Sequence, residues 1–420
     1  MILWLLSTLF AVFLVHQFWY RRRHLPHGPT PLPFFGNFLS FAKENRWEDV
    51  FLKWKQRYGP VMTVWMGMKP MVFVTEHSTA HRLFVKEGET SLAADPSESS
   101  WRRASGGDNN AAFVLQTLRD FGMNKSQSQS RILDEVQYVI DRLNEDVRAG
   151  VKEVSLLAYT DIAIGSVVNS INKQEEFYQL KEQTTQILTN LANPLFRILV
   201  RSPSLHGFQW VQRKLEHAVK PQKEVFRFLD GIIQQHEEQN DYSAEMEPSD
   251  FIDAFLLERN RQEKSGEQHY FTHEQLRNVV FDMWFAGQET TSSTLTWGVA
   301  HLIRNLDAQK KLHDELDRVI GSDRSITMAD KAALPYTNAV INEIQRCANI
   351  LGLNLPRRCG RDVEIDGHRI PAGMTIVPQI SVMHIDPEFS TGKEPPILRK
   401  LVGGPSTTIV PYKCRVTKRF

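Results

Sequence analysis

The sequence has few cysteines and no excess of charge of either sign. Three cysteines occur among 420 residues, namely Cys347, Cys359 and Cys414. They show no disulfide-like pairing and are consistent with a reducing compartment. Basic residues number 50 and acidic residues 49, so the composition gives no electrostatic reason to expect nucleic acid as a partner. Internal repeats and Gly/Ser-rich linkers are also missing, and no such feature divides the main body of the chain.

The first twenty residues are mainly apolar and end at Phe18-Trp19-Tyr20, directly before Arg21-Arg22-Arg23. About twenty residues are enough for a helix to span a bilayer, and aromatic residues followed by basic ones favour a cytoplasmic exit. A cleaved signal peptide would carry its positive charge before the apolar run and small residues at a cleavage site, and this segment has neither. Residues 1–20 are therefore predicted to be a transmembrane signal-anchor, with a buried core helix as the alternative.

Prolines and local patterns predict how the rest of the chain is organised. Residues 21–36 carry the basic cluster and four prolines, which predict a stiff, extended linker. Residues 37–420 are predicted to form one mostly helical domain with a small sheet. A hairpin is expected from Val61–Trp65 and Met71–Val74, and helical periodicity dominates from about Ser130 to Leu316. Within it, one apolar stripe is typical of helical periodicity: Ile132, Leu133, Val136, Val139 and Ile140.

A second long apolar stretch, Val279 to Ile303, is interrupted by small and proton-carrying residues. Its apolar residues recur at three- and four-residue spacing, which predicts a buried helix. Its centre, here called the polar notch, is residues 286–291, Ala286-Gly287-Gln288-Glu289-Thr290-Thr291. The two small residues would let a flat group lie against the helix, the threonines can bond to carbonyls one turn earlier, and the glutamate can relay protons. A threonine pair is also common as a simple kink in a core helix.

Further motifs follow the polar notch in a fixed order. Glu343 and Arg346 lie one helical turn apart within an apolar frame. After them come Pro356-Arg357-Arg358, a predicted hairpin around Asp366-Gly367, and the segments Ile370 to Met374 and His384 to Phe389. This ordered set resembles the cytochrome P-450 family of haem-thiolate monooxygenases, and specifically its microsomal animal type. The resemblance runs from the N-terminus to about Phe389.

The resemblance implies a fold, a reaction and partners. The expected fold is a helical cytochrome P-450-like domain with a small β-sheet, preceded by one N-terminal transmembrane helix. The expected reaction inserts one oxygen atom from O2 into a small lipophilic substrate, with haem as the cofactor and electrons from an NADPH-dependent reductase. The expected location is the endoplasmic reticulum membrane, with the domain on the cytoplasmic side.

The resemblance also assigns roles to residues of this chain. Ala286 and Gly287 match the part of the distal helix that passes over the haem, and Thr290 matches a threonine that orders water there. Glu289 is similar to the acidic partner in proton delivery. Glu343 and Arg346 are similar to a buried structural ion pair, which would be costly to break from one side. Arg358, or else Arg357, corresponds to a cation near a haem propionate, with a solvated arginine pair as the alternative.

Two parts of the chain depart from the family pattern. The family's axial cysteine lies in a glycine-containing loop after the segment that ends at Phe389, and no such loop follows here. Cys414 is the remaining substitute, since neighbouring lysines and arginines would lower its pKa, but no glycine turn holds it toward a haem. The domain is also altered at about residues 91–112, where Gly107 and Ala111 replace a Trp and an Arg that reach a propionate. Trp101 and Arg102 could reach the cofactor by another path, or form an exposed basic loop.

Two hypotheses follow. The first is a membrane-anchored monooxygenase in which Thr290 and Glu289 handle protons. The second is a non-catalytic, membrane-anchored helical binding protein, a pseudoenzyme or splice form that does not hold haem. The family pattern favours the first hypothesis, and the missing cysteine loop favours the second. The sequence therefore predicts a monooxygenase by descent whose present form is impaired.

Overall fold

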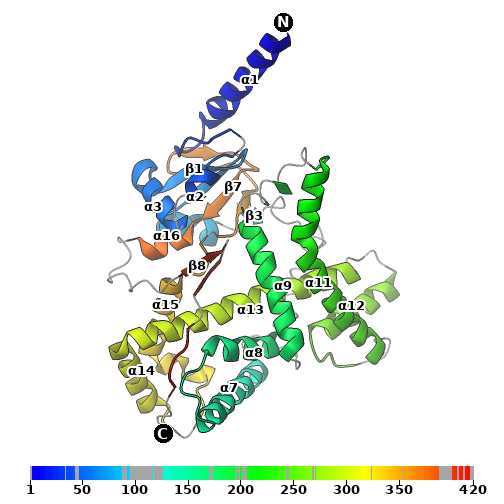
Figure 1. The fold of residues 1–420 in the computed structure, drawn as a ribbon, viewed down its shortest axis with the longest axis vertical. Helices are drawn as coiled ribbons and strands as arrows, with labels where there is room; N and C mark the ends of the chain where they lie inside the picture. The colour runs from blue at the N-terminus through cyan, green and yellow to red at the C-terminus, as the bar shows by residue number, and fades with distance from the viewer. Residues whose placement is uncertain are drawn as a thin grey trace.

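The computed structural model describes most of the chain. The described residues are 2–33, 35–42, 47–87, 92–94, 117, 126–169, 174–193, 196, 199–200, 206–242, 246–266, 269, 271–322, 324–352, 354–386, 400–403, 406–409 and 412–416. They form a mostly helical protein with a small sheet, as the sequence predicts. Figure 1 shows the sheet on the side of the molecule nearest the N-terminal helix and most of the helices on the other side.

The N-terminal helix α1 (Ile2–Phe18) extends away from the folded body (Figure 1). Most of the apolar side chains that the structure describes on this helix are exposed, among them Trp4 at 81% and Leu5 at 63%. The short helix η1 (Tyr20–Arg22) follows it. None of the described helices is both long enough and apolar enough to cross a membrane.

The main sheet is formed by segments far apart in the sequence. Among the described residues its strand order is β1-β2-β7-β4-β3. The predicted hairpin is confirmed as β1 (Val61–Met66) and β2 (Lys69–Val74), paired antiparallel with Val61 opposite Val74. β7 (Thr375–Pro378) runs parallel to β2, and β4 (Arg357–Cys359) joins it to β3 (Leu92–Ala94). The sheet therefore ties the N-terminal region to the chain beyond residue 356.

Two hairpins lie outside this sheet. β5 (Val363–Ile365) pairs with β6 (His368–Ile370). The turn between them has Asp366 at φ 47° and Gly367 at φ 76°, the left-handed pair that a two-residue hairpin requires, so this sequence prediction is confirmed. β8 (Lys400–Gly403) pairs with β9 (Ser406–Ile409), and this hairpin contacts helices α9 (Gln174–Ala192) and α13 (His273–Arg304).

The other helices pack around the sheet and around α13. Beside the sheet lie α2 (Phe38–Ala42), α3 (Trp47–Tyr58), α4 (His77–His81), the π-helix η2 (Arg82–Lys86) and α16 (Ile380–Ile385). The remaining described helices are α7 (Ser126–Arg148), α8 (Leu156–Asn169), α11 (Gln209–Gln239), α12 (Phe251–Ser265), α14 (Leu306–Val319), η4 (Met328–Ala333) and α15 (Pro335–Ala348). α13 crosses this helical part of the molecule (Figure 1) and contacts α8, α11, α12, α14 and α15.

The packing shows what two segments with clear sequence patterns lie against. The segment predicted as a stiff, extended linker lies along β1, and its prolines Pro26, Pro29 and Pro31 are buried. Thr63 N donates to His27 O at 3.3 Å, and Asn37 N donates to Trp65 O at 2.7 Å. The predicted apolar stripe lies on helix α7, and Ile132, Val136 and Ile140 on it are each at least 45% exposed. The spacing correctly predicts the helix, but periodicity alone does not identify what covers an apolar face.

Candidate functional site

The polar notch lies in the middle of α13, between turns that are packed into the core. Trp284 and Trp297, on either side of it, are each 1% exposed. In contrast, Ala286 is exposed, and Gly287, Glu289 and Thr290 are partly exposed. Small residues on a central helix are thus left open on one side, as the sequence predicts for a surface that receives a flat group. The Thr290 hydroxyl donates to the Ala286 carbonyl at 2.6 Å, which is the predicted bond to the preceding turn.

Two carboxyl groups near the polar notch hold their protons unusually tightly. Burial raises the pKa of Glu289, while Lys181 opposes this effect and Asp161 adds to it. Desolvation by the surrounding protein also raises the pKa of Asp282, two turns before Glu289 on the same helix, to about 6, although the residue itself is exposed. A carboxyl that exchanges a proton close to neutral pH is suited to proton transfer.

A buried charge cluster that sequence reasoning missed lies behind the polar notch. Asp161 on α8 forms an ion pair with Lys181 on α9, and their side chains are 4% and 19% exposed. The Ser292 hydroxyl of α13 donates to the same carboxylate, and Gln288 Nε2 donates to the Asp161 backbone carbonyl at 3.0 Å. The available signal was an aspartate inside the apolar helix of residues 156–169, but its partners are 20 and 131 residues away along the chain.

The predicted ion pair between Glu343 and Arg346 is formed on α15. Arg346 Nη2 donates to Glu343 Oε1 at 2.7 Å, and Arg346 Nη1 donates to the His384 carbonyl at 2.6 Å. The Arg346 guanidinium lowers the pKa of Glu343. The resemblance implied a buried pair, but the Glu343 side chain is 58% exposed and the Arg346 side chain is 23% exposed. Breaking it is consequently less costly than breaking a buried pair.

The predicted propionate-binding cations are only partly placed. Arg357 and Arg358 lie on β4, where Arg357 is exposed and Arg358 is half-buried. The structure therefore favours Arg358 over Arg357 as the more enclosed guanidinium. Trp101 and Arg102, together with Gly107 and Ala111, lie outside the described residues.

All three thiols of the chain lie in described residues, and none of them forms a disulfide. Cys359 is buried in the core beside the sheet, where burial raises its pKa to about 11. Cys414 is paired with Val154 through backbone hydrogen bonds, and burial raises its pKa as well. This corrects the expectation that neighbouring cations lower the pKa of Cys414. Lys413 and Arg415 are exposed to solvent, whereas Cys414 is buried, so the effect of burial prevails. Cys347 is half-buried and its Sγ donates to Glu343 Oε1 at 3.4 Å.

The described residues suit the two sides of a haem-thiolate centre to different degrees. The open side of α13 suits a flat cofactor, but the axial ligand must be an ionised thiol. Burial raises the pKa of the Cys359 thiol to about 11 and also raises the pKa of the Cys414 thiol, and the Cys347 thiol donates a hydrogen bond to the Glu343 carboxylate. Among the described residues, the open face of α13 can receive a flat group, and each thiol would have to give up a proton that its surroundings stabilise in order to bind iron.

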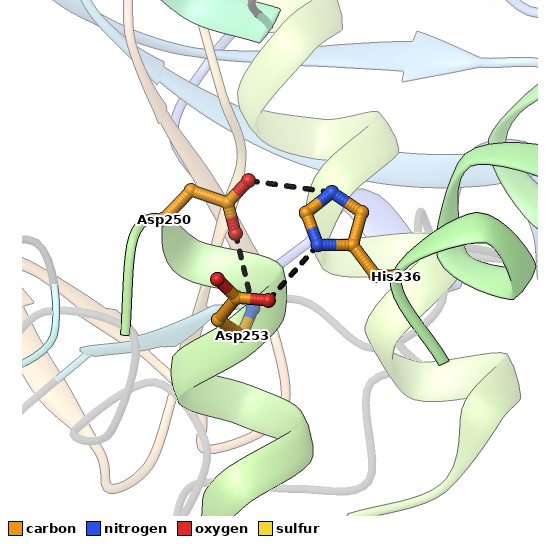
Figure 2. A group of neighbouring side chains, drawn as sticks. All are labelled: His236, Asp250 and Asp253. Atoms are coloured by element: carbon orange, nitrogen blue, oxygen red, sulfur yellow. Dashed lines mark hydrogen bonds and ion pairs between the residues drawn. The ribbon is translucent and has the colours of Figure 1, made fainter. Parts of the chain in front are cut away.

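One cluster of metal-ligand type occurs among the described residues, made by His236, Asp250 and Asp253 (Figure 2). Asp253 is 1% exposed, and its Oδ1 accepts hydrogen bonds from His236 Nδ1 at 2.9 Å and Tyr242 OH at 2.7 Å. Its Oδ2 accepts a bond from the Ser249 backbone N–H at 3.1 Å. Burial opposes ionisation of Asp253, but these bonds lower its pKa to about 2. The carboxylate is saturated by protein donors, so the cluster fastens α11 to the start of α12.

Comparison with known proteins identifies the lineage. The chain matches the model of the family described as Cytochrome P450 over residues 26–390. It is 30% identical to Cytochrome P450 2A11 of Oryctolagus cuniculus, over 92% of this chain and 81% of that protein. It is 32% identical to Cytochrome P450 2C70 of Rattus norvegicus, over 91% and 80%, and 31% identical to Cytochrome P450 2A13 of Homo sapiens, over 92% and 81%. The family match includes the polar notch, Glu343, Arg346 and Arg358, and it ends before Cys414.

Proposed function

Because the chain belongs to the cytochrome P450 family of haem-thiolate monooxygenases, we propose that it derives from an enzyme acting on small lipophilic substrates and that its present form is impaired in oxygen insertion. Members of the family bind haem. The argument for the proposed impairment is the surroundings of the thiols: burial raises the pKa of Cys359 and of Cys414, and the Cys347 thiol donates a hydrogen bond to Glu343. Without an ionised sulfur the iron lacks the ligand on which the family's chemistry depends.

The polar notch keeps the features needed on the distal side. Ala286 and Gly287 leave an open helix face that suits the haem plane. Thr290 directs its hydroxyl proton to the Ala286 carbonyl, which leaves the oxygen lone pairs available to accept a hydrogen bond from water. Glu289 is the proposed proton donor, because its raised pKa keeps it protonated closer to neutral pH than an exposed glutamate. Arg358 is the proposed partner of a propionate.

The proposed setting is the cytoplasmic face of the endoplasmic reticulum membrane, with residues 1–20 as a single anchor. The exposed apolar side chains of α1 support membrane association. The electron donor would be an NADPH-dependent reductase.

The thiol observation also favours a second candidate, a non-catalytic, membrane-anchored binding protein. In that case the helical body would bind lipophilic molecules or proteins and would not need an iron ligand. The two candidates differ in whether the purified chain retains haem.

The reduced, carbon monoxide-bound spectrum tests the proposal. The chain is expressed with excess haem, purified, reduced and exposed to carbon monoxide, beside Cytochrome P450 2A13 as a positive control. The expected result is bound haem without the Soret band of thiolate ligation, and absence of any bound haem would favour the binding protein. A thiolate-type band in the wild type would overturn the proposed impairment. Loss of that band in Cys414→Ser would then identify the ligand.

A further inference from the structure

The buried pair of Asp161 and Lys181 is fixed in place by three helices. Asp161 comes from α8, Lys181 from α9, and the hydrogen-bond donors Gln288 and Ser292 from α13. The Asp161 carboxylate bonds to the Lys181 ammonium and the Ser292 hydroxyl, and its backbone carbonyl accepts the amide of Gln288. Breaking any one of these contacts would leave a buried polar group without its partner. The lysine side chain therefore has little freedom to leave this position.

The two α13 donors lie on either side of Glu289 in the sequence. Gln288 precedes this glutamate, and Ser292 is one helical turn after it. The cluster is therefore attached to the same turn of α13 that carries the proposed proton donor. Among the described residues of the neighbouring helices, Lys181 and Asp161 are the charged groups that act on Glu289, with opposite effects. Asp282, two turns earlier, is the other acidic group on this part of α13.

We propose that Lys181, held by Asp161, is a positioning residue that controls the protonation of Glu289. A fixed cation favours the ionised carboxylate, and the surrounding protein favours the neutral acid. Asp161 determines how much of the lysine charge Glu289 experiences, because the aspartate neutralises part of it at close range. The inference rests on the proposed role of Glu289 in proton transfer, but it concerns the protein alone and holds with or without haem.

The proton on Glu289 can be followed directly by infrared spectroscopy. The carboxyl band that is present in the full-length protein and missing from Glu289→Gln belongs to Glu289, and its loss with rising pH gives the titration midpoint. Lys181→Met removes the cation and should move this midpoint to higher pH. Asp161→Asn leaves the lysine charge uncompensated and should move it to lower pH. Lys181→Arg keeps the charge and should return the midpoint toward that of the wild type.

A structural disturbance would produce a different pattern. The double variant Asp161→Asn, Lys181→Met removes both charges, so its titration midpoint should lie between those of the single variants. If the single variants instead shifted the midpoint by disturbing the structure, the double variant should show a larger shift than either of them. Lys220→Met, an exposed lysine on α11, is the matched control and should not change the midpoint. A folded Lys181→Met protein with the wild-type midpoint would overturn the proposal, and should that variant not fold, an unchanged midpoint in Asp161→Asn would do the same. A missing thiolate spectrum would count against catalysis by this chain, but it would not change the shifts of the Glu289 midpoint expected in the Lys181 and Asp161 variants.

Discussion

Single side chains in this protein show how far burial shifts a titration. Asp282 has a folded pKa of about 6 against an ordinary value of 3.8 because of burial. The folded protein therefore binds this proton more tightly than the unfolded chain does, and stability is lost as the pH rises from about 4 through about 6. We expect Asp282→Asn to increase the free energy of unfolding by about 1 kcal/mol at pH 8, a value reduced for solvent screening, and to leave it unchanged at pH 4.

Urea denaturation at the two pH values checks this prediction. Asp134→Asn, an exposed aspartate on α7, is the matched control and should have no pH-dependent effect. Equal stabilisation by Asp282→Asn at both pH values would show that the charge of Asp282 is not the cause.

The pKa of Asp253 is shifted in the opposite direction to that of Asp282. Although burial opposes it, hydrogen bonding from Ser249, His236 and Tyr242 lowers the pKa of Asp253 to about 2 from 3.8. Its stabilising contribution is therefore complete above about pH 4 and is lost as the pH falls through about 2. Asp253→Asn should lower the free energy of unfolding at pH 7 by roughly 3 kcal/mol, because buried donors lose a charged acceptor. Asp250→Asn, whose side chain is partly exposed, should cost less than about 1 kcal/mol.

Thermal unfolding of both variants with and without a chelator checks this account. The chelator should not change either melting temperature if hydrogen bonds alone stabilise the junction of α11 and α12. A large fall of the wild-type melting temperature on chelation would contradict it.

At the scale of elements, the segment before α2 is packed against β1 by close backbone contact. A Cβ built on Gly28 would lie 2.0 Å from the Thr63 carbonyl oxygen, and backbone cannot move aside cheaply. Gly28→Ala should therefore lower the free energy of unfolding by roughly 3 kcal/mol. Gly231 in α11 has nothing within 4 Å of its built Cβ, and Gly231→Ala should stabilise by about 0.5 to 1 kcal/mol. Chemical denaturation of the two variants checks the contrast, and equal effects would contradict the packing.

The sequence predicts elements where one local pattern decides the structure. The helix with the polar notch, the β1–β2 hairpin and the turn at Asp366-Gly367 follow from periodicity and turn chemistry, and the structure confirms all three. The packing of residues 26–37 on β1 was not predictable, because proline content indicates stiffness and does not identify a surface to lie on. The exposure of the apolar stripe on α7 was not predictable either, because periodicity identifies the helix and not what covers it.

In the candidate site, too, residues of one continuous segment could be predicted from the sequence, and residues brought together by packing could not. The polar notch is one continuous segment, so its residues could be named from the sequence. Asp161 and Lys181 could not, since their link to Ser292 depends on how α8 and α9 pack against α13. The effect of burial on Cys414 was also hidden, because the charges beside it in the sequence point to solvent while the sulfur is buried.

At the scale of the whole molecule, the N-terminal helix is the part that lies apart from the body (Figure 1). Deleting residues 1–23 removes its exposed apolar surface, and the protein should move from the membrane fraction to the soluble fraction after ultracentrifugation. A full-length control with Arg21, Arg22 and Arg23 changed to glutamine keeps that surface and should stay membrane-bound. Unchanged sedimentation of the deleted form would show that another surface holds the membrane.

The central claim for the whole molecule is that a cytochrome P450 fold here keeps its distal helix without a sulfur ligand for iron. Magnetic circular dichroism of the haem-loaded ferric protein reads the axial ligand directly. We expect no thiolate signature in the wild type, and the same spectrum in Cys347→Ser, Cys359→Ser and Cys414→Ser. A thiolate signature that disappears in one of these variants alone would contradict the account.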